Sequence, residues 1–231
     1  MSKVVLVVDD ELRMRKLISD FLVRENYTIV EADNGATALD IFSSQKIDLV
    51  ILDVMMPKYD GWTVCREIRR TSTIPIIMLT AKSEEIDQLF GFDLGVDEYI
   101  TKPFSPRVLT ARVNALFRRL EAAPANETEA NESSPTSFAG LSIDPSAHFV
   151  AINGNRLDLT PKEYDLLVYL AENKGRALSR EQILNHIWSY DYFGDLRTVD
   201  THINRLRTKL GEHSSLIQTI RGFGYRFEVE S

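Results

Sequence analysis

The sequence is poor in cysteine, with a single one, Cys65, in 231 residues. One cysteine excludes a disulfide framework and any zinc site built from several thiolates. Because Cys65 stands in a segment with a helical pattern, we interpret it as a small core side chain rather than a reactive thiol. Glycine and proline are also scarce, at 11 and 8, which excludes a fibrous or wholly disordered chain.

Long apolar runs are missing as well. No stretch approaches the roughly 20 residues that span a bilayer. The first apolar run, residues 4–8, is too short for a signal peptide and ends in acidic residues. These absences predict a cytoplasmic protein without a membrane partner. The net charge of −7, from 34 acidic and 27 basic residues, gives no general indication of nucleic-acid binding.

The composition changes sharply once along the chain. Residues 121–137 read EAAPANETEANESSPTS, with four Glu, no Lys or Arg, and no aromatic or large aliphatic residue. Such a segment cannot bury a core, so we predict a flexible acidic linker. It separates two predicted domains, residues 1–120 and residues 138–231, which a chain of 26.3 kDa is long enough to form.

The first predicted domain alternates strand and helix patterns. Continuous apolar runs at residues 4–8, 49–52 and 74–79 are typical of strands buried on both faces of a parallel sheet. Residues 28–31 and 98–101 predict two shorter strands, and amphipathic helical patterns lie between the strands. The order predicts a doubly wound α/β domain with a five-stranded parallel sheet.

Polar side chains follow four of these five predicted strands. In an open parallel sheet the functional crevice lies at the carboxyl ends of the strands, so these side chains should meet there. Three close carboxylates need a counter-charge, and an oxygen-rich cluster of this kind suits Mg²⁺ and a phosphoryl group. The alternative is that each Asp is only a helix cap or turn former; their joint position favours a site. The residues are Asp9, Asp10, Glu11, Asp53, Thr80 and Lys102.

Residues 1–120 resemble the receiver domain of bacterial response regulators. The matching segments are Val8–Glu11, Asp53–Pro57 with Asp60-Gly61, Leu79–Ala81, and Gly95–Tyr99 running into Lys102-Pro103-Phe104. The resemblance implies that Asp53 accepts a phosphoryl group from a phosphohistidine on a sensor kinase.

The same resemblance implies roles for the neighbours of Asp53. Asp10, Asp53 and the Met55 carbonyl are expected to bind Mg²⁺, with Asp9 acting through water. Lys102 is expected to pair with phosphoryl oxygens, and its bond to Pro103 to be cis. Thr80 would move to bind the phosphoryl group, and Tyr99 would turn into the space that Thr80 leaves.

The second predicted domain begins with strand patterns and ends in a hairpin. Residues 141–143 and 149–152 read as strands, and Asn153-Gly154 is a hairpin signal. Helical patterns cover residues 161–173, 179–188 and 198–210, and a second hairpin joins residues 217–220 to residues 225–229. This order predicts an α+β winged helix-turn-helix domain.

The distribution of charge indicates DNA binding in this domain. Between Arg197 and Arg226 there are six basic residues and two acidic ones. The helix at residues 198–210 places apolar residues on one stripe, and the opposite face carries Thr201, Asn204 and Arg205. A solvated helix face is the alternative interpretation. The hairpin tip with Arg221, which suits a minor groove, favours DNA.

Residues 138–231 resemble the effector domain of the OmpR/PhoB subfamily. The matching segments are Leu159–Leu167, Ser179–Leu184, Arg197–Ile203, Leu206–Leu210 and Arg221–Tyr225. The resemblance implies base contacts by Thr201 and Arg205 and a minor-groove contact by Arg221. The residues that it implies for phosphate contacts are Trp188, Arg197, Thr198, Thr219 and Tyr225. The loop at residues 189–195 corresponds to one that contacts RNA polymerase.

The family's dimer face has a partial match. Asp97, Glu98, Arg112 and Arg119 match its charged residues, whereas Gln88, Val108 and Asn114 replace others. We therefore expect a homodimer on phosphorylation that is weaker or more apolar than is typical for the family.

We therefore predict a transcription factor, not an enzyme, that is switched by phosphorylation of Asp53. One rival is a phosphohydrolase with Asp53 or Asp9 as nucleophile, but dehalogenase-type enzymes need an Asp-x-Asp after the first strand, which Asp9-Asp10-Glu11 lacks. Another rival is a DNA-binding regulator that senses a ligand or partner, whose DNA affinity a phosphodonor would leave unchanged.

Overall fold

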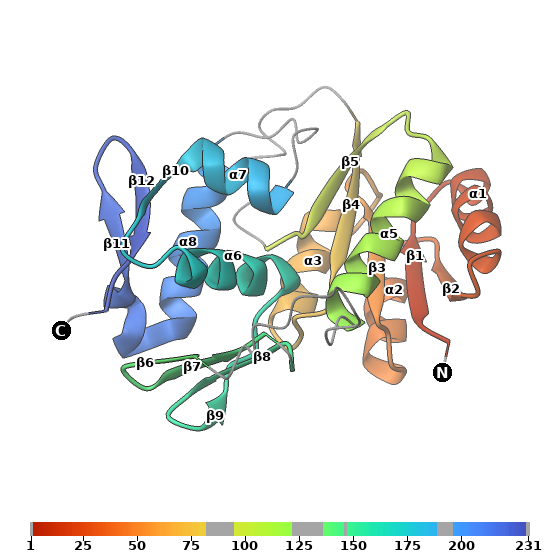
Figure 1. The fold of residues 1–231 in the computed structure, drawn as a ribbon. Helices are drawn as coiled ribbons and strands as arrows, with labels where there is room; N and C mark the ends of the chain where they lie inside the picture. The colour runs from red at the N-terminus through yellow and green to blue at the C-terminus, as the bar shows by residue number, and fades with distance from the viewer. Residues whose placement is uncertain (1, 82–94, 122–135, 146, 189–195, 230–231) are drawn as a thin grey trace. The chain divides into compact units, whose positions relative to one another are not determined.

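The chain forms two compact units, residues 1–117 and residues 118–231, here called the N-terminal and C-terminal units. A computed structural model describes residues 2–81, 95–121, 136–145, 147–188 and 196–229 (Figure 1). No helix in these ranges is long and apolar enough to cross a membrane.

The N-terminal unit is built on a five-stranded sheet in the order β2-β1-β3-β4-β5. All neighbouring strands are parallel, which confirms the predicted doubly wound fold. The strands are β1 (Val4–Val8), β2 (Thr28–Ala32), β3 (Leu49–Asp53), β4 (Ile76–Ala81) and β5 (Glu98–Lys102). The described helices are α1 (Leu12–Val23), α2 (Gly35–Ser44), α3 (Gly61–Arg69) and α5 (Pro106–Glu121).

The central strands bury nearly every side chain. All five residues of β3 are buried, because β1 and β4 flank it and helices cover the sheet. Cys65 of α3 is fully buried, as its interpretation as a core residue requires. The Lys102–Pro103 peptide bond is cis, as the resemblance implies.

The start of α3 lies against the end of β3. Asp60 caps the helix by accepting a hydrogen bond from the Thr63 N–H at 2.7 Å. A Cβ on Gly61 would lie 2.3 Å from the Asp53 carbonyl oxygen, so only glycine permits this approach. The contact holds the backbone at the carboxyl end of β3, where the predicted acceptor lies.

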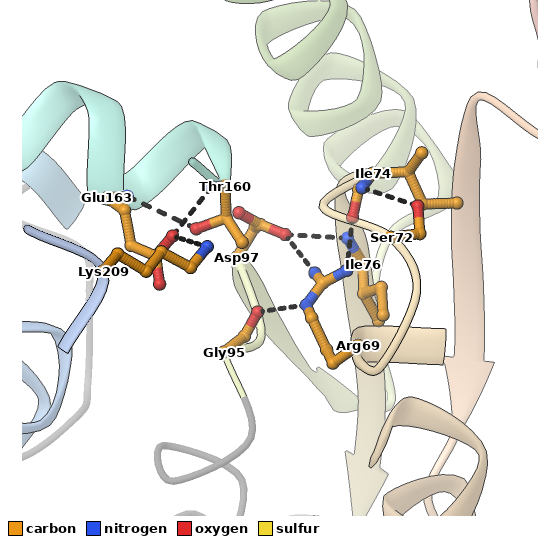
Figure 2. Close-up of polar contacts among 9 residues, drawn as sticks. All are labelled: Arg69, Ser72, Ile74, Ile76, Gly95, Asp97, Thr160, Glu163 and Lys209. Carbon is orange, nitrogen blue, oxygen red and sulfur yellow. Dashed lines mark hydrogen bonds and ion pairs between the residues drawn. The ribbon is translucent and has the colours of Figure 1, made fainter. Parts of the chain in front are cut away.

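Strand β4 begins two residues later than predicted, at Ile76. Arg69, the last residue of α3, donates hydrogen bonds to the Ile74 carbonyl at 2.6 Å and to the Gly95 carbonyl at 3.0 Å (Figure 2). The Arg69 guanidinium also forms an ion pair of 2.9 Å with Asp97. The Ile74 carbonyl thus accepts a hydrogen bond from α3, and the pairing of β4 with β3 and with β5 begins at Ile76 and Ile77.

The C-terminal unit has two antiparallel sheets and three α-helices among its described residues, in agreement with the predicted α+β class. One sheet has the order β6-β7-β8-β9 and the other β10-β12-β11. The strands of the first are β6 (Thr136–Phe138), β7 (Leu141–Asp144), β8 (Phe149–Ile152) and β9 (Asn155–Arg156). The elements that follow are α6 (Pro161–Glu172), β10 (Ala177–Ser179), α7 (Arg180–Trp188), α8 (Arg197–Leu210), the 3₁₀ helix η1 (Gly211–Leu216), β11 (Ile217–Ile220) and β12 (Gly224–Phe227).

Short sequence motifs determine one turn and one helix start in this unit. Asn153 and Gly154 both have positive φ, 50° and 83°, as the tight turn of a two-residue hairpin requires. Thr160 and Glu163 form a capping box at the start of α6. Glu163 also accepts a hydrogen bond from Lys209 of α8 at 2.6 Å, so the cap joins two helices (Figure 2).

The predicted linker was too long at both ends. Glu121 is the last residue of α5, and Thr136 and Ser137 pair with β7 as part of β6. Residues 122–135 lie outside the described residues. The pairing of β6 was not predicted because its polar residues, Thr136 and Ser137, carry no apolar pattern.

Candidate functional site

The structure brings together three carboxylates at the carboxyl edge of the N-terminal sheet. Asp9 and Asp10 follow β1, and Asp53 ends the neighbouring strand β3. One oxygen of each carboxylate lies within 4.8 Å of the others. Asp9 and Asp53 are buried, with 0% and 4% of their surface exposed, whereas Asp10 is exposed.

Lys102 supplies the positive charge of this cluster. It ends β5, and its ammonium reaches past β4 to lie 2.8 Å from Asp9 Oδ2 and 3.0 Å from Asp53 Oδ1. Burial lowers the pKa of Lys102, but hydrogen bonds to Asp9 and Asp53 and their negative charges outweigh this and raise the pKa above its usual value. Lys102 is therefore protonated at neutral pH.

The environment of Asp53 disfavours the ionised form of its carboxylate. Desolvation by burial raises its pKa above the usual value, although Lys102 acts in the opposite direction; the charges of Asp9 and Asp10 raise it further. Counted formally, three carboxylates and one ammonium carry a net charge of −2. A further cation would therefore stabilise the ionised form of Asp53.

Arg15 of α1 supports the loop that carries two of these carboxylates. Its guanidinium donates hydrogen bonds to the backbone carbonyls of Asp9 at 2.7 Å and of Asp10 at 3.2 Å. The Glu11 N–H donates to Asp9 Oδ1 at 2.8 Å. Arg15 was not among the predicted site residues, although its position four residues after Glu11 places it on the first turns of α1, beside this loop.

Thr80 and Tyr99, the two residues with predicted switch roles, lie on adjacent strands. Thr80 is buried in β4, and its hydroxyl donates to the Ala81 carbonyl at 3.3 Å. Tyr99 of β5 is half-buried, with its ring centroid 6.2 Å from that of Trp62. The Met55 side chain is 58% exposed, beyond the end of β3. The movements predicted for Thr80 and Tyr99 stay predictions.

The predicted dimer-face residues divide into three cases. The Asp97 carboxylate turns into the unit and accepts from Arg69 and from the Ile76 N–H, both at 2.9 Å, so its place on the dimer face stays a prediction (Figure 2). Glu98 and Arg112 form an ion pair of 2.7 Å within one chain. The Arg119 side chain and Gln88 lie outside what the structure describes.

In the C-terminal unit, α8 presents the two faces that the sequence predicted. Thr201 and Arg205 are half-buried and Asn204 is exposed, on the side opposite the core. The buried apolar stripe consists of Val199, Ile203, Leu206 and Leu210, and Thr198 and His202 are buried as well. Helix α8 therefore packs on one face and offers polar side chains on the other.

The residues predicted to contact phosphates lie at different depths. Arg197 and Thr219 are exposed, and Arg221 is exposed at the tip of the β11–β12 hairpin. The other predicted residues, Trp188, Thr198 and Tyr225, are only 2%, 0% and 4% exposed. Their side chains therefore support the face from within more than they form its surface.

An ionic cluster joins α8 to the β11–β12 hairpin. Asp200 accepts hydrogen bonds of 2.7 Å from Arg180 and from the Tyr225 hydroxyl. The Arg180 and Arg207 guanidinium groups lie 5.2 and 5.6 Å from the Tyr225 ring centroid. Burial is the main cause that raises the pKa of Tyr225 to about 12, so its hydroxyl stays a donor.

Arg207 extends this cluster to β11. It donates to the Ile217 carbonyl at 2.6 Å and to the Thr219 hydroxyl at 2.9 Å. Arg180, Asp200 and Arg207 were not among the predicted site residues, because no sequence pattern indicates that residues from α7, α8 and the hairpin are paired.

The two units match two known domain families. Residues 5–114 match the response regulator receiver domain, and residues 154–227 match the C-terminal domain of transcriptional regulatory proteins. The chain is also 49% identical to the transcriptional regulatory protein ResD of Bacillus subtilis (strain 168), over 97% of this chain and 95% of ResD. The chain is a response regulator of the OmpR/PhoB family.

Other relatives agree with this assignment. The response regulator is 45% identical to the transcriptional regulatory protein SrrA of Staphylococcus aureus (strain NCTC 8325 / PS 47), over 100% of this chain and 98% of SrrA. Among solved structures, DrrB, described as a Thermotoga maritima OmpR/PhoB homolog, is 33% identical with a TM-score of 0.52; the match covers 99% of this chain and 100% of DrrB. A mutant of RitR is 28% identical with a TM-score of 0.69, over 99% of this chain and 100% of that chain.

Proposed function

We propose that this response regulator accepts a phosphoryl group on Asp53 from a sensor histidine kinase and thereby controls its dimerisation and its binding to promoter DNA. The observation that carries the proposal is the buried Asp53 carboxylate, 3.0 Å from the Lys102 ammonium and beside Asp9 and Asp10. Membership of the response regulator family supports the same role.

The proposed step is a simple displacement at phosphorus. An Asp53 carboxylate oxygen attacks the phosphorus of a phosphohistidine, the P–N bond breaks, and the imidazole leaves and keeps the electron pair of that bond. The product is an acyl phosphate on Asp53. The Lys102 ammonium attracts the negative phosphoryl oxygens as a point charge. The Thr80 hydroxyl donates a hydrogen bond to a phosphoryl oxygen after Thr80 moves.

We propose Mg²⁺ as the cofactor of this step. Asp10, Asp53 and the Met55 carbonyl would bind it, with Asp9 acting through a water molecule. The donor set fits, because carboxylate and carbonyl oxygens are the ligands that Mg²⁺ prefers, and the cluster carries a net charge of −2 with Lys102 included. When bound, the cation reduces the repulsion between the phosphoryl oxygens and the carboxylates.

We propose that α8 and the β11–β12 hairpin bind DNA. Thr201, Asn204 and Arg205 would read base edges in a major groove, and Arg221 would enter the adjacent minor groove.

Arg197 and Thr219 are exposed and suit phosphate contacts. Thr198 is fully buried at the start of α8, so its hydroxyl would support this face from within. Trp188 and Tyr225 would mainly stabilise the structure of the proposed DNA-binding face.

The remaining parts of the proposal concern partners and location. RNA polymerase would contact residues 189–195, which lie outside the described residues. The homodimer would use Glu98 and Arg112, now paired within one chain, together with Arg119. We propose a cytoplasmic regulator without catalytic turnover of its own and without a membrane partner.

Labelling of the intact chain tests this proposal. The wild-type chain is incubated with Mg²⁺ and acetyl phosphate, and its mass is measured. We expect one added phosphoryl group in the wild type and none in Asp53→Ala. Asp33→Ala, which removes an exposed acid just after β2, is the matched control and should be labelled like the wild type.

Labelling that persists in Asp53→Ala would contradict the choice of acceptor. Steady release of phosphate from small esters, in excess of the protein, would instead support the rival interpretation as a phosphohydrolase.

A further inference from the structure

Phe223 is an exposed aromatic residue at the tip of the β11–β12 hairpin. Of the large apolar side chains that the structure describes in the C-terminal unit, it alone is exposed, with 46% of its surface accessible. The other large apolar side chains described there are buried or partly buried, mostly in one core. A single exposed apolar side chain is ordinary on a protein surface, so exposure alone does not indicate a function for Phe223.

The backbone holds this tip in a fixed shape. The Phe223 N–H donates to the Ile220 carbonyl at 3.0 Å, closing a turn in which Gly222 has a φ of 74°. On the other side, a Cβ on Gly224 would lie 2.1 Å from the Leu178 carbonyl oxygen of β10. Phe223 therefore stands between one glycine needed for the turn and one needed for close packing.

The base of the hairpin is fixed to α8. Tyr225 donates to Asp200 of α8 at 2.7 Å, and Arg207 of α8 donates to Thr219 of β11 at 2.9 Å. The hairpin projects from the unit (Figure 1). The direction of the tip is therefore set relative to the helix proposed to enter the major groove.

The chemistry around Phe223 favours nucleic acid over an apolar protein surface. Arg221, two residues away, is exposed and carries a positive charge, and the described residues 217–227 contain two arginines and no acid. A flat apolar ring beside a cation suits the minor groove, whose walls are sugar C–H groups and whose rim is lined with phosphates. Apolar wedges such as Phe are known to insert there between base steps.

We propose that Phe223 is a DNA-contact residue that packs its ring into the minor groove, beside the Arg221 guanidinium. The proposal rests on the proposed DNA-binding function and adds a contact to it that carries no charge. Arg221 would supply the electrostatic part of the contact and Phe223 the apolar part. The two residues should therefore differ in how their contributions depend on salt.

Salt titrations of the full-length chain separate these contributions. The probe is a duplex selected from a random-sequence pool by the wild-type chain and then trimmed to one half-site and to two half-sites. We expect Phe223→Ala to bind the single half-site about tenfold more weakly at every salt concentration, a difference of about 1.4 kcal/mol. Arg221→Ala should instead reduce the slope of log K against log salt by about one.

Two further variants guard against a trivial loss of structure. Phe223→Leu keeps an apolar side chain and should lose less affinity than Phe223→Ala. Phe223→Trp should retain affinity, and its added fluorescence should change when the duplex is bound, by comparison with the wild type. Equal thermal midpoints for all variants show that the fold is intact.

Three results would overturn the inference while leaving the proposed function in place. The first is wild-type affinity in Phe223→Ala. The second is a loss seen only with two half-sites, which would assign Phe223 to contact with a neighbouring copy. The third is a change in salt slope equal to that of Arg221→Ala. A wild-type chain that selects no duplex would overturn the proposed DNA binding and this inference together.

Discussion

Asp53 lies where two requirements conflict. A nucleophilic carboxylate must be ionised, yet burial beside Asp9 and Asp10 disfavours its charge and raises its pKa, against the opposing effect of Lys102. When folding raises the pKa of an acidic group, the fold loses stability as the pH rises above the pKa that the group has in the unfolded chain. That unfolded-state pKa is 3.8 for Asp53. The ionised acceptor should therefore be a local source of instability at neutral pH.

Asp53→Asn should for this reason stabilise the protein. At pH 7 and with metal ions removed by EDTA, we expect the free energy of unfolding of the N-terminal unit to rise by on the order of 1 kcal/mol. Thermal unfolding of the full-length chain measures it, with Asp33→Asn as a control for the loss of one negative charge. A lower midpoint in Asp53→Asn would mean that the ion pair with Lys102 outweighs the burial of the carboxylate.

His202 is a second buried titratable residue, on the core side of α8. Its ring packs edge-on against Trp188, with centroids 4.9 Å apart, and Nδ1 lies 3.0 Å from the Thr198 carbonyl. Burial is the main cause that lowers the pKa of His202 to about 4, with Arg205 and Lys162 acting in the same direction and Thr198 and Glu163 in the opposite one. His202 is therefore neutral in the folded protein at physiological pH.

The depressed pKa of His202 predicts a pH dependence of stability. The unfolded chain binds the proton with a pKa of 6.5, so stability from the neutral ring is complete above pH 6.5 and is lost as the pH falls toward 4. The total loss should be about 3 kcal/mol. Denaturant unfolding of the C-terminal unit across this range should show a smaller decline in His202→Gln than in the wild type; parallel declines would contradict the assignment.

The strands of the N-terminal sheet were the most predictable elements of the fold. Strands β1 and β3 are continuous apolar runs because both of their faces are covered, and this pattern needs no knowledge of partners. Strand β10 was not predicted, because its three residues pair only with β12, about 50 residues later in the chain. Short strands of this kind are defined by their partner rather than by their own sequence.

The same distinction holds for the site. Asp9, Asp10, Asp53 and Lys102 were predictable because the topology of a parallel sheet brings the ends of its strands to one edge. The inward turn of the Asp97 side chain could not be predicted, because its partner Arg69 is 28 residues away on α3. The cluster of Arg180, Asp200 and Tyr225 joins three separate elements, and no spacing in the sequence indicates it.

Helix α8 carries the prediction about sequence reading. Arg205 lies on the face opposite the buried stripe and is long enough to reach a base edge. We expect Arg205→Ala to relax discrimination at one or two base positions by about 1–3 kcal/mol each. Binding of the variant to a panel of single-base changes in the selected duplex measures this effect. An equal loss of affinity on every duplex would show that Arg205 contacts a phosphate.

The proposed phosphoryl acceptor and the proposed DNA-binding face lie in different units of the chain. Asp53 belongs to the N-terminal unit, and α8 and its hairpin belong to the C-terminal unit. Control of DNA binding by phosphorylation therefore requires a coupling between units, and the proposed homodimer supplies one. In each chain Arg112 already pairs with Glu98, so a dimer must share or exchange these partners. Because Glu98 is buried and already paired, we expect a weak dimer whose formation is sensitive to protein concentration.

The most direct test of this account is the DNA affinity of the full-length chain with and without acetyl phosphate. The two-half-site duplex is titrated with the wild type and with Asp53→Ala in the presence of Mg²⁺, and labelling is followed by mass in the same samples. We expect acetyl phosphate to raise the affinity of the wild type by about 5- to 150-fold, the usual range for coupled sites, and to leave Asp53→Ala unchanged. An unchanged affinity in a fully labelled wild type, or an equal rise in Asp53→Ala, would contradict the claim that phosphorylation of Asp53 controls DNA binding.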